Sequence, residues 1–280
     1  MIVTAHDGLP IAVSTGAGSG PGLLACHATG FCKECWDPVL ADPALDGTAW
    51  AAVDQRAHGD TGAPPLPFDW WDNARDVLAV VDTLGWEHPV GLGHSSGAAA
   101  LLMAEILRPG TFAALVAVEP IVFPGPVQRW EDIPLAAQAE RRRAAFPSRD
   151  AALEWFRGRG AFAHWDDSVL RAYIEHGFRA DDGGGVALKC RPEHEAEHYR
   201  CARASGAWDR LGEVGCPVLV AGGADSHSHP RAFLEEQAAR LPDARVEILE
   251  GATHFAPMER PAEVAGWAAR ALAGVDPGPR

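Results

Sequence analysis

Short apolar runs alternate along the chain with stretches in which apolar residues recur at helical spacing. Val77, Val80 and Val81, for example, fall on one face of a helix predicted over residues 68–84. Buried strands are predicted at residues 23–26, 48–54, 90–92, 112–118, 217–221 and 245–249, and further helices at residues 98–107, 231–241 and 261–272. The first 14 residues alternate between apolar and polar positions on both sides of an Asp7-Gly8 turn, which predicts a hairpin over residues 1–14. This succession favours an α/β fold with a mostly parallel sheet and helices on both faces.

The alternation stops between residues 124 and 210. This segment contains four candidate helices and no run typical of a buried strand. We therefore expect a helical cap, residues 124–210, inserted into a core made of residues 1–123 and 211–280. The aromatic residues of the segment are Trp130, Phe146, Trp155, Phe156, Phe162 and Trp165. Most of them should pack within the cap, and one or two should line an apolar substrate cleft.

Composition narrows the range of partners. The net charge of −14 argues against nucleic acids and anionic membranes, because phosphate groups repel such a surface. No apolar run approaches the ~20 residues of a membrane span, and the first residues lack a signal-peptide pattern. We expect a cytoplasmic protein with a small apolar substrate, and the sequence leaves a homo-oligomer open.

One pentapeptide, Gly93-His94-Ser95-Ser96-Gly97, carries the clearest chemistry. It lies between a predicted strand and a predicted helix, which is the context of a G-x-S-x-G nucleophile elbow. The sharp turn would lift the Ser95 hydroxyl out of the sheet. It would also place the Ser96 N–H at a helix start, directed at a developing oxyanion.

A serine nucleophile needs a base, and the base needs an acid to orient it. His254 is the candidate base, because it follows a late strand on a loop that can reach the carboxyl edge of the sheet. Two acids compete. Glu119 directly follows an apolar strand and would be poorly solvated without a partner. Asp225 follows the strand at residues 217–221, which ends at the same edge.

These motifs, in this order, resemble the α/β-hydrolase fold superfamily, in its serine-nucleophile branch with a helical lid. His27-Ala28-Thr29 is similar to that family's His-Gly-x loop. Residues 54–60 resemble its D-x-R-G-x-G-x-S turn, and residues 251–255 resemble its G-x-x-H-F loop. The resemblance implies that the Thr29 N–H is the second oxyanion donor. Most members place the acid after the penultimate strand, where Asp225 lies. Some place a Glu 24 residues after the nucleophile, and because Glu119 has that spacing we favour it.

A serine at the elbow implies acyl transfer without a cofactor or metal. We expect hydrolysis of a small or medium apolar ester or lactone. Hydrolysis of a carbon–carbon bond in a dienoic ring-cleavage product is the alternative, and a weakly active ligand sensor of the same fold is another.

Two histidine-rich segments suggest metal binding. His194-Glu195-Ala196-Glu197-His198 matches the H-E-x-x-H pattern of zinc hydrolases, but its flanks are polar, so we expect a charged, solvated helix. Residues 225–229 alternate polar and imidazole groups, and we expect a polar loop before a helix that begins at Pro230.

Overall fold

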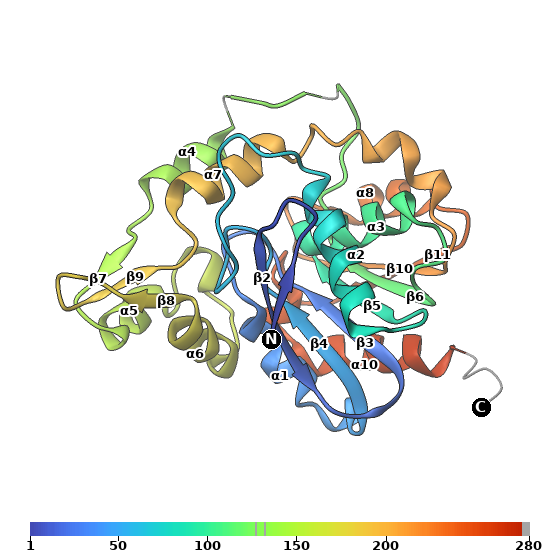
Figure 1. Cartoon of the computed structure of the whole chain (residues 1–280), viewed down its shortest axis with the longest axis horizontal. Coiled ribbons are helices and arrows are strands. Elements are labelled where there is room, and N and C mark those ends of the chain that lie inside the picture. Colours follow the sequence, from blue (N-terminus) through green and yellow to red (C-terminus); the bar gives the residue numbers. More distant parts are fainter. Residues whose placement is uncertain (127, 132, 276–280) are drawn as a thin grey trace.

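The computed structural model describes residues 1–126, 128–131 and 133–275. Its main sheet has eight strands in the order β1-β2-β4-β3-β5-β6-β10-β11 (Figure 1). The strands are β1 (Ile2–Thr4), β2 (Pro10–Gly16), β3 (Ser19–Cys26), β4 (Thr48–Val53), β5 (Val90–His94), β6 (Ala114–Val118), β10 (Val218–Gly223) and β11 (Ala244–Leu249). The pairs β1–β2 and β2–β4 are antiparallel, and every other pair in this sheet is parallel. The predicted α/β fold is confirmed.

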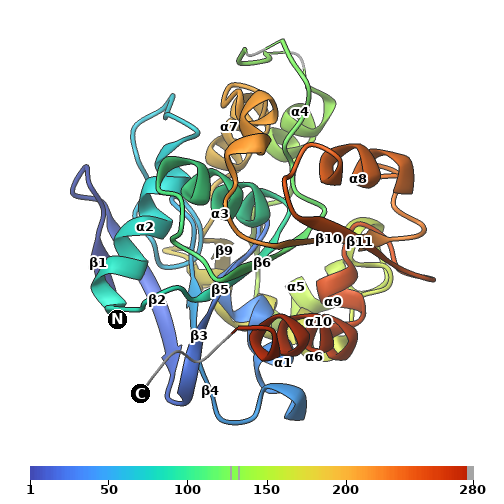
Figure 2. The same ribbon diagram turned by 90° about the vertical axis from the view of Figure 1, so that its right-hand side faces the viewer.

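Helices cover both faces of this sheet (Figure 2). One face packs against α2 (Asp72–Leu84), α3 (Ser96–Leu107) and α8 (Arg231–Ala238), through a core that includes Val77, Leu101 and Leu234. The other face packs against α1 (Asp37–Leu40) and α10 (Pro261–Ala273), through Val39, Val264 and Trp267. Because both faces are buried, the central strands are continuous apolar runs. A short helix, α9 (Ala256–Glu259), precedes α10.

The segment between β6 and β10 forms a separate layer beside the sheet (Figure 1). Its helices are α4 (Pro134–Arg141), α5 (Arg149–Phe156), α6 (Asp167–His176) and α7 (Pro192–Cys201). It also contains a small antiparallel sheet of β7 (Ala145–Phe146), β9 (Val186–Leu188) and β8 (Phe178–Ala180). The segment is therefore mainly helical, as expected, but the three short strands in it were not predicted. Strands of two or three residues are too short to produce a readable alternation. The described chain also has short 3₁₀ helices. They are Lys33–Trp36 and Pro43–Leu45, which precede β4, and Gly160–Phe162 and Ala207–Glu213, which lie between β6 and β10.

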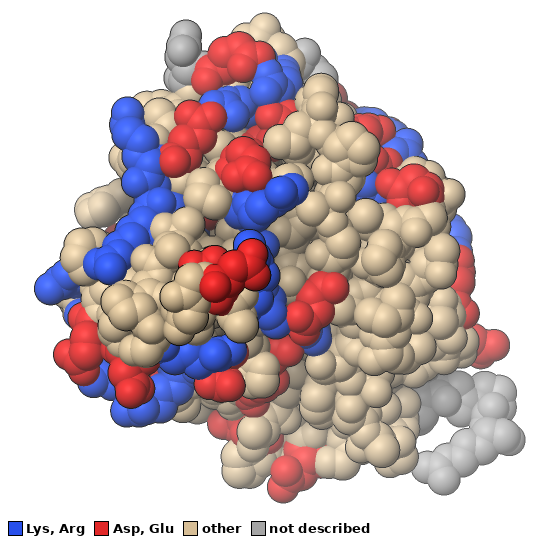
Figure 3. All heavy atoms as spheres, turned by 60° about the vertical axis from the view of Figure 1, so that its left-hand side comes forward, with Lys and Arg blue, Asp and Glu red and all other residues tan. Residues whose placement is uncertain are grey.

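Aromatic residues form the core of this layer. Phe146, Phe156 and Trp165 are buried with Tyr173 and Phe178, and Phe31 of the main domain packs into the same cluster. Figure 3 shows Lys and Arg side chains beside Asp and Glu on the surface of the molecule. Arg157 and Asp167 of this layer, both exposed, form an ion pair at 2.6 Å. Among the described residues, no helix has both the length and the apolar character needed to cross a bilayer.

Candidate active site

Ser95 occupies a strained turn between β5 and α3. Its backbone has φ 55° and ψ −112°, outside the regions that non-glycine residues normally adopt. The flanking glycines make this turn sterically feasible. A Cβ on Gly97 would lie 2.2 Å from the carbonyl oxygen of Cys26, and one on Gly93 would lie 2.5 Å from Cα of Ala98. Such strain, costing about 1–3 kcal/mol, persists only where the surrounding structure enforces it.

The two predicted oxyanion donors lie on adjacent parts of the sheet edge. Ser96 is the first residue of α3, and Thr29 follows β3. Within the described part of the chain, neither backbone N–H donates a hydrogen bond to another protein group. Gln55 connects the two segments, because its Nε2 donates to Ser96 Oγ at 2.9 Å and also to the carbonyl of His27.

This bridge leads to a first prediction. Gln55→Leu should lower kcat by about 10-fold or more with little change in KM, because it unties the two donors that would hold the oxyanion. Ser96→Ala removes only one of the two contacts and keeps the Ser96 N–H, so its loss should be smaller. Steady-state kinetics of both variants tests the order of the effects. Equal losses in the two variants would contradict a bridging role for Gln55.

His254 lies directly against Glu119. His254 Nδ1 is 2.5 Å from Glu119 Oε2, and His94 Nε2 donates to the His254 carbonyl at 2.8 Å. Burial and the neighbouring His254 lower the pKa of His94 to about 3, so this ring is neutral and acts as a donor. The His254 ring is oriented through its Nδ1 atom, and within the described residues its Nε2 atom makes no hydrogen bond.

Glu119 is fully buried and has φ 47°, again in the left-handed region. Its Oε1 accepts from the Gly223 N–H at 3.0 Å, and its Oε2 accepts from Ser226 Oγ at 2.8 Å. Burial alone would raise the pKa of Glu119. Hydrogen bonds from His229 and His254 outweigh this effect and hold that pKa well below its usual range. The carboxylate is therefore charged at neutral pH.

The other candidate acid, Asp225, is exposed on the loop after β10. Its backbone N–H donates to the Ala252 carbonyl at 2.9 Å. Of the two carboxylates, the one in contact with His254 is Glu119. Ser226, one residue beyond Asp225 on this loop, contacts Glu119 through its hydroxyl group.

Ser95, Thr29 and His254 line one cavity of about 950 Å³. Its apolar lining includes Ile121, Phe123, Trp130, Ile133, Leu135 and Phe162. No hydrogen bond joins Ser95 Oγ to His254 among the described residues. Contacts of this kind often tighten only when the substrate is bound. Since Trp130, Ile133, Leu135 and Phe162 lie between β6 and β10, the cap supplies much of the apolar lining of this cavity.

The H-E-x-x-H helix differs from the expectation. His194 and His198 on α7 are buried, not solvated, and their Nε2 atoms lie 3.2 Å from two different carbonyls, those of Pro64 and Arg56. A carbonyl can only accept, so the Nε2 atom of His198 carries a proton and is not free to ligate a metal. Neither histidine belongs to a group of three potential metal ligands among the described residues. Glu197 is paired with Arg129 at 2.7 Å, which allows this polar helix to be buried.

Glu119, His229 and His254 do bring three potential ligand atoms within 4.8 Å of one another. Tetrahedral zinc with bonds of 2.0–2.1 Å would separate its ligand atoms by about 3.3 Å. The 2.5 Å contact between His254 and Glu119 is much shorter, and Ser226 already donates to the same oxygen. We therefore interpret the cluster as a hydrogen-bonded network. The sequence alone suggested only a polar loop for His229 and Ser226, and no local signal links them to Glu119.

Four matches to known proteins bear on this site. The model of the alpha/beta hydrolase family matches residues 23–267. A 2-(acetamidomethylene)succinate hydrolase of Mesorhizobium japonicum is 27% identical over 240 residues, which are 85% of this chain and 83% of that protein. Among solved structures, E-2-(acetamidomethylene)succinate hydrolase superposes with a TM-score of 0.84 at 23% identity, covering 98% of both chains. The enol-lactonase of Burkholderia xenovorans superposes with a TM-score of 0.74 at 16% identity, covering 98% of this chain and 100% of that one.

Proposed function

Because the chain belongs to the alpha/beta hydrolase family, we propose that it is a serine hydrolase that cleaves a small or medium apolar ester or lactone. The observation that carries this proposal is the strained Ser95 turn, which shares a cavity with His254, while His254 contacts the buried Glu119 carboxylate. The mostly apolar lining supports an apolar substrate. A solved structure of the same fold is an enol-lactonase, which is consistent with cyclic esters as substrates.

In the proposed mechanism His254 removes the Ser95 proton, and Ser95 Oγ forms a bond to the substrate carbonyl carbon. The negative charge on the carbonyl oxygen is held by the N–H groups of Ser96 and Thr29. His254 then gives its proton to the leaving alkoxide, and an acyl-enzyme remains. A water molecule, deprotonated by His254, attacks the acyl carbon and releases the acid and the free serine. Glu119 stabilises the His254 imidazolium in both steps.

Labelling with a fluorophosphonate, followed by peptide mapping, tests this proposal. We expect stoichiometric modification of Ser95 in the native protein and none in Ser95→Ala, because only an activated serine attacks the phosphorus. Hydrolysis of aryl esters and lactones should disappear in the same variant. A folded native protein that is not labelled, and that turns over none of these substrates, would contradict the proposal.

A further inference from the structure

His229 lies at the end of the loop after β10, immediately before Pro230 and α8. It is 1% exposed. Its ring packs beside those of Phe123 and Phe233, with centroid distances of 5.7 and 5.4 Å. A buried imidazole in such surroundings needs partners for both ring nitrogens.

Both nitrogens of His229 face the Glu119–Pro120 segment. His229 Nδ1 is 3.3 Å from Glu119 Oε2, and His229 Nε2 is 3.2 Å from the Pro120 carbonyl oxygen. Gln237 Nε2, on α8, donates to the same carbonyl at 2.7 Å. The carbonyl held in this way belongs to Pro120, the residue after Glu119, and the Glu119 backbone is in the strained left-handed region at φ 47°. His229 therefore contacts both the Glu119 side chain and the backbone of the next residue, Pro120.

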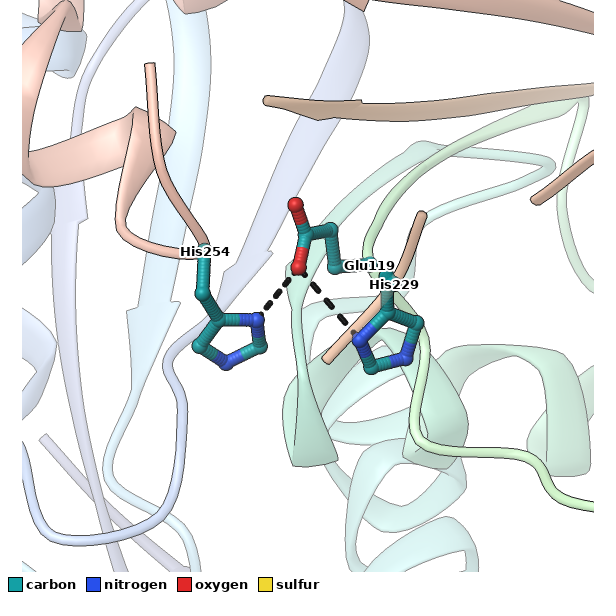
Figure 4. A group of neighbouring side chains, drawn as sticks. All are labelled: Glu119, His229 and His254. Carbon is teal, nitrogen blue, oxygen red and sulfur yellow. Dashed lines mark hydrogen bonds and ion pairs between the residues drawn. The ribbon is translucent and has the colours of Figure 1, made fainter. Parts of the chain in front are cut away.

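Two imidazoles share one carboxylate oxygen. Figure 4 shows His254 and His229 approaching Glu119 Oε2 through their Nδ1 atoms. The two rings are nearly parallel, with an interplanar angle of 19° and a centroid distance of 5.5 Å. Nε2 of His229 faces the Pro120 carbonyl and Nδ1 faces the Glu119 carboxylate, and both of these oxygens can only accept, so a ring that bonds to both donates through both nitrogens. Ser228 Oγ, 3.1 Å from Nδ1, lies beside the second of these contacts.

We propose that His229 is a positioning residue that fixes the Glu119 carboxylate and its strained backbone for contact with His254. This inference rests on the proposed function, because it assigns His229 a role in orienting the base of that reaction. The ring supports the carboxylate on the side away from His254 and, with Gln237, restrains the Pro120 carbonyl. Displacements of about 1 Å in such supporting groups can cost 10²-fold in rate.

The decisive variant is His229→Phe, which keeps an aromatic ring between Phe123 and Phe233 but removes both polar contacts. We expect kcat to fall about 10- to 100-fold, with KM changing much less. His229→Gln can still donate to the Pro120 carbonyl and should recover part of the loss. Phe233→Leu is the matched packing control. It should lower Tm while kcat stays close to that of the native protein, because both nitrogens of His229 keep their partners.

Proton NMR supplies a readout that does not depend on turnover. The proton in the short His254–Glu119 hydrogen bond should give a strongly deshielded resonance in the native protein. In His229→Phe this resonance should broaden or move upfield, and in Phe233→Leu it should not. If it stays unchanged in both His229 variants and their kcat equals that of the native protein, His229 only fills space and the inference is wrong.

The same resonance separates the two proposals. Absence of Ser95 labelling in the native protein would remove the proposed function. The response of the resonance to His229→Phe would still report whether the ring holds Glu119 against His254. If His229→Phe does not fold, His229→Gln decides, because the inference requires a measurable loss of kcat and a shifted resonance in that variant as well.

Discussion

Glu119→Gln should lower kcat by about 10³-fold or more, whereas Asp225→Asn should change it by less than about threefold. The Gln amide preserves the shape of the side chain but removes the charge that stabilises the His254 imidazolium. The amide can also present an N–H to Nδ1, which would favour the wrong tautomer of the base. Asp225 is exposed, and the carboxylate 2.5 Å from His254 Nδ1 is that of Glu119.

Kinetics on an activated ester, with circular dichroism to verify folding, tests this pair of variants. A collapse of kcat in Asp225→Asn alone would show that the loop after β10 supplies the acid. It would also mean that Glu119 has only a structural role in the folded protein. Comparable losses in both variants would contradict the single-acid arrangement proposed for His254.

Gly97→Ala should destabilise the protein by about 3 kcal/mol and abolish labelling of Ser95. The new Cβ would lie 2.2 Å from the Cys26 carbonyl oxygen and 2.6 Å from that of His27, and both atoms belong to the backbone. Relief of this clash requires α3 to move away from β3. That movement would separate the Ser96 and Thr29 N–H groups and release the strained turn at Ser95. Thermal unfolding and labelling measured on the same sample test both consequences.

Gly266→Ala is the matched control for this substitution. Gly266 is also a helical glycine, in α10, and the nearest atom to its added Cβ is the end of the Arg270 side chain at 3.8 Å. Alanine there should stabilise the helix by about 0.5–1 kcal/mol. If Gly97→Ala were as stable as Gly266→Ala, the close approach of α3 to β3 would not be what makes glycine necessary at the elbow.

Local sequence patterns were sufficient to predict the main sheet and the turn at Ser95. The strands and helices around it are long enough to display their periods, and the steric demand for Gly93 and Gly97 acts within a few residues of Ser95. The cap was harder to predict. Its two- and three-residue strands show no period, and the polar surface of α7 suggested solvent exposure. Arg129 and Arg142 instead form ion pairs with Glu197 and Glu195 and allow that helix to be buried.

The sequence by itself determined the fold, the serine at the elbow and the histidine that follows β11, because each depends on neighbours in the chain. It left two acids open. Only the tertiary structure decided that Glu119 contacts His254, 135 positions away, and that His229 supports the same carboxylate. The parallel sheet decides this, because it brings the carboxyl ends of β5, β6 and β10 to one edge. Which side chains meet there depends on strand order and loop conformation, and no local pattern records either.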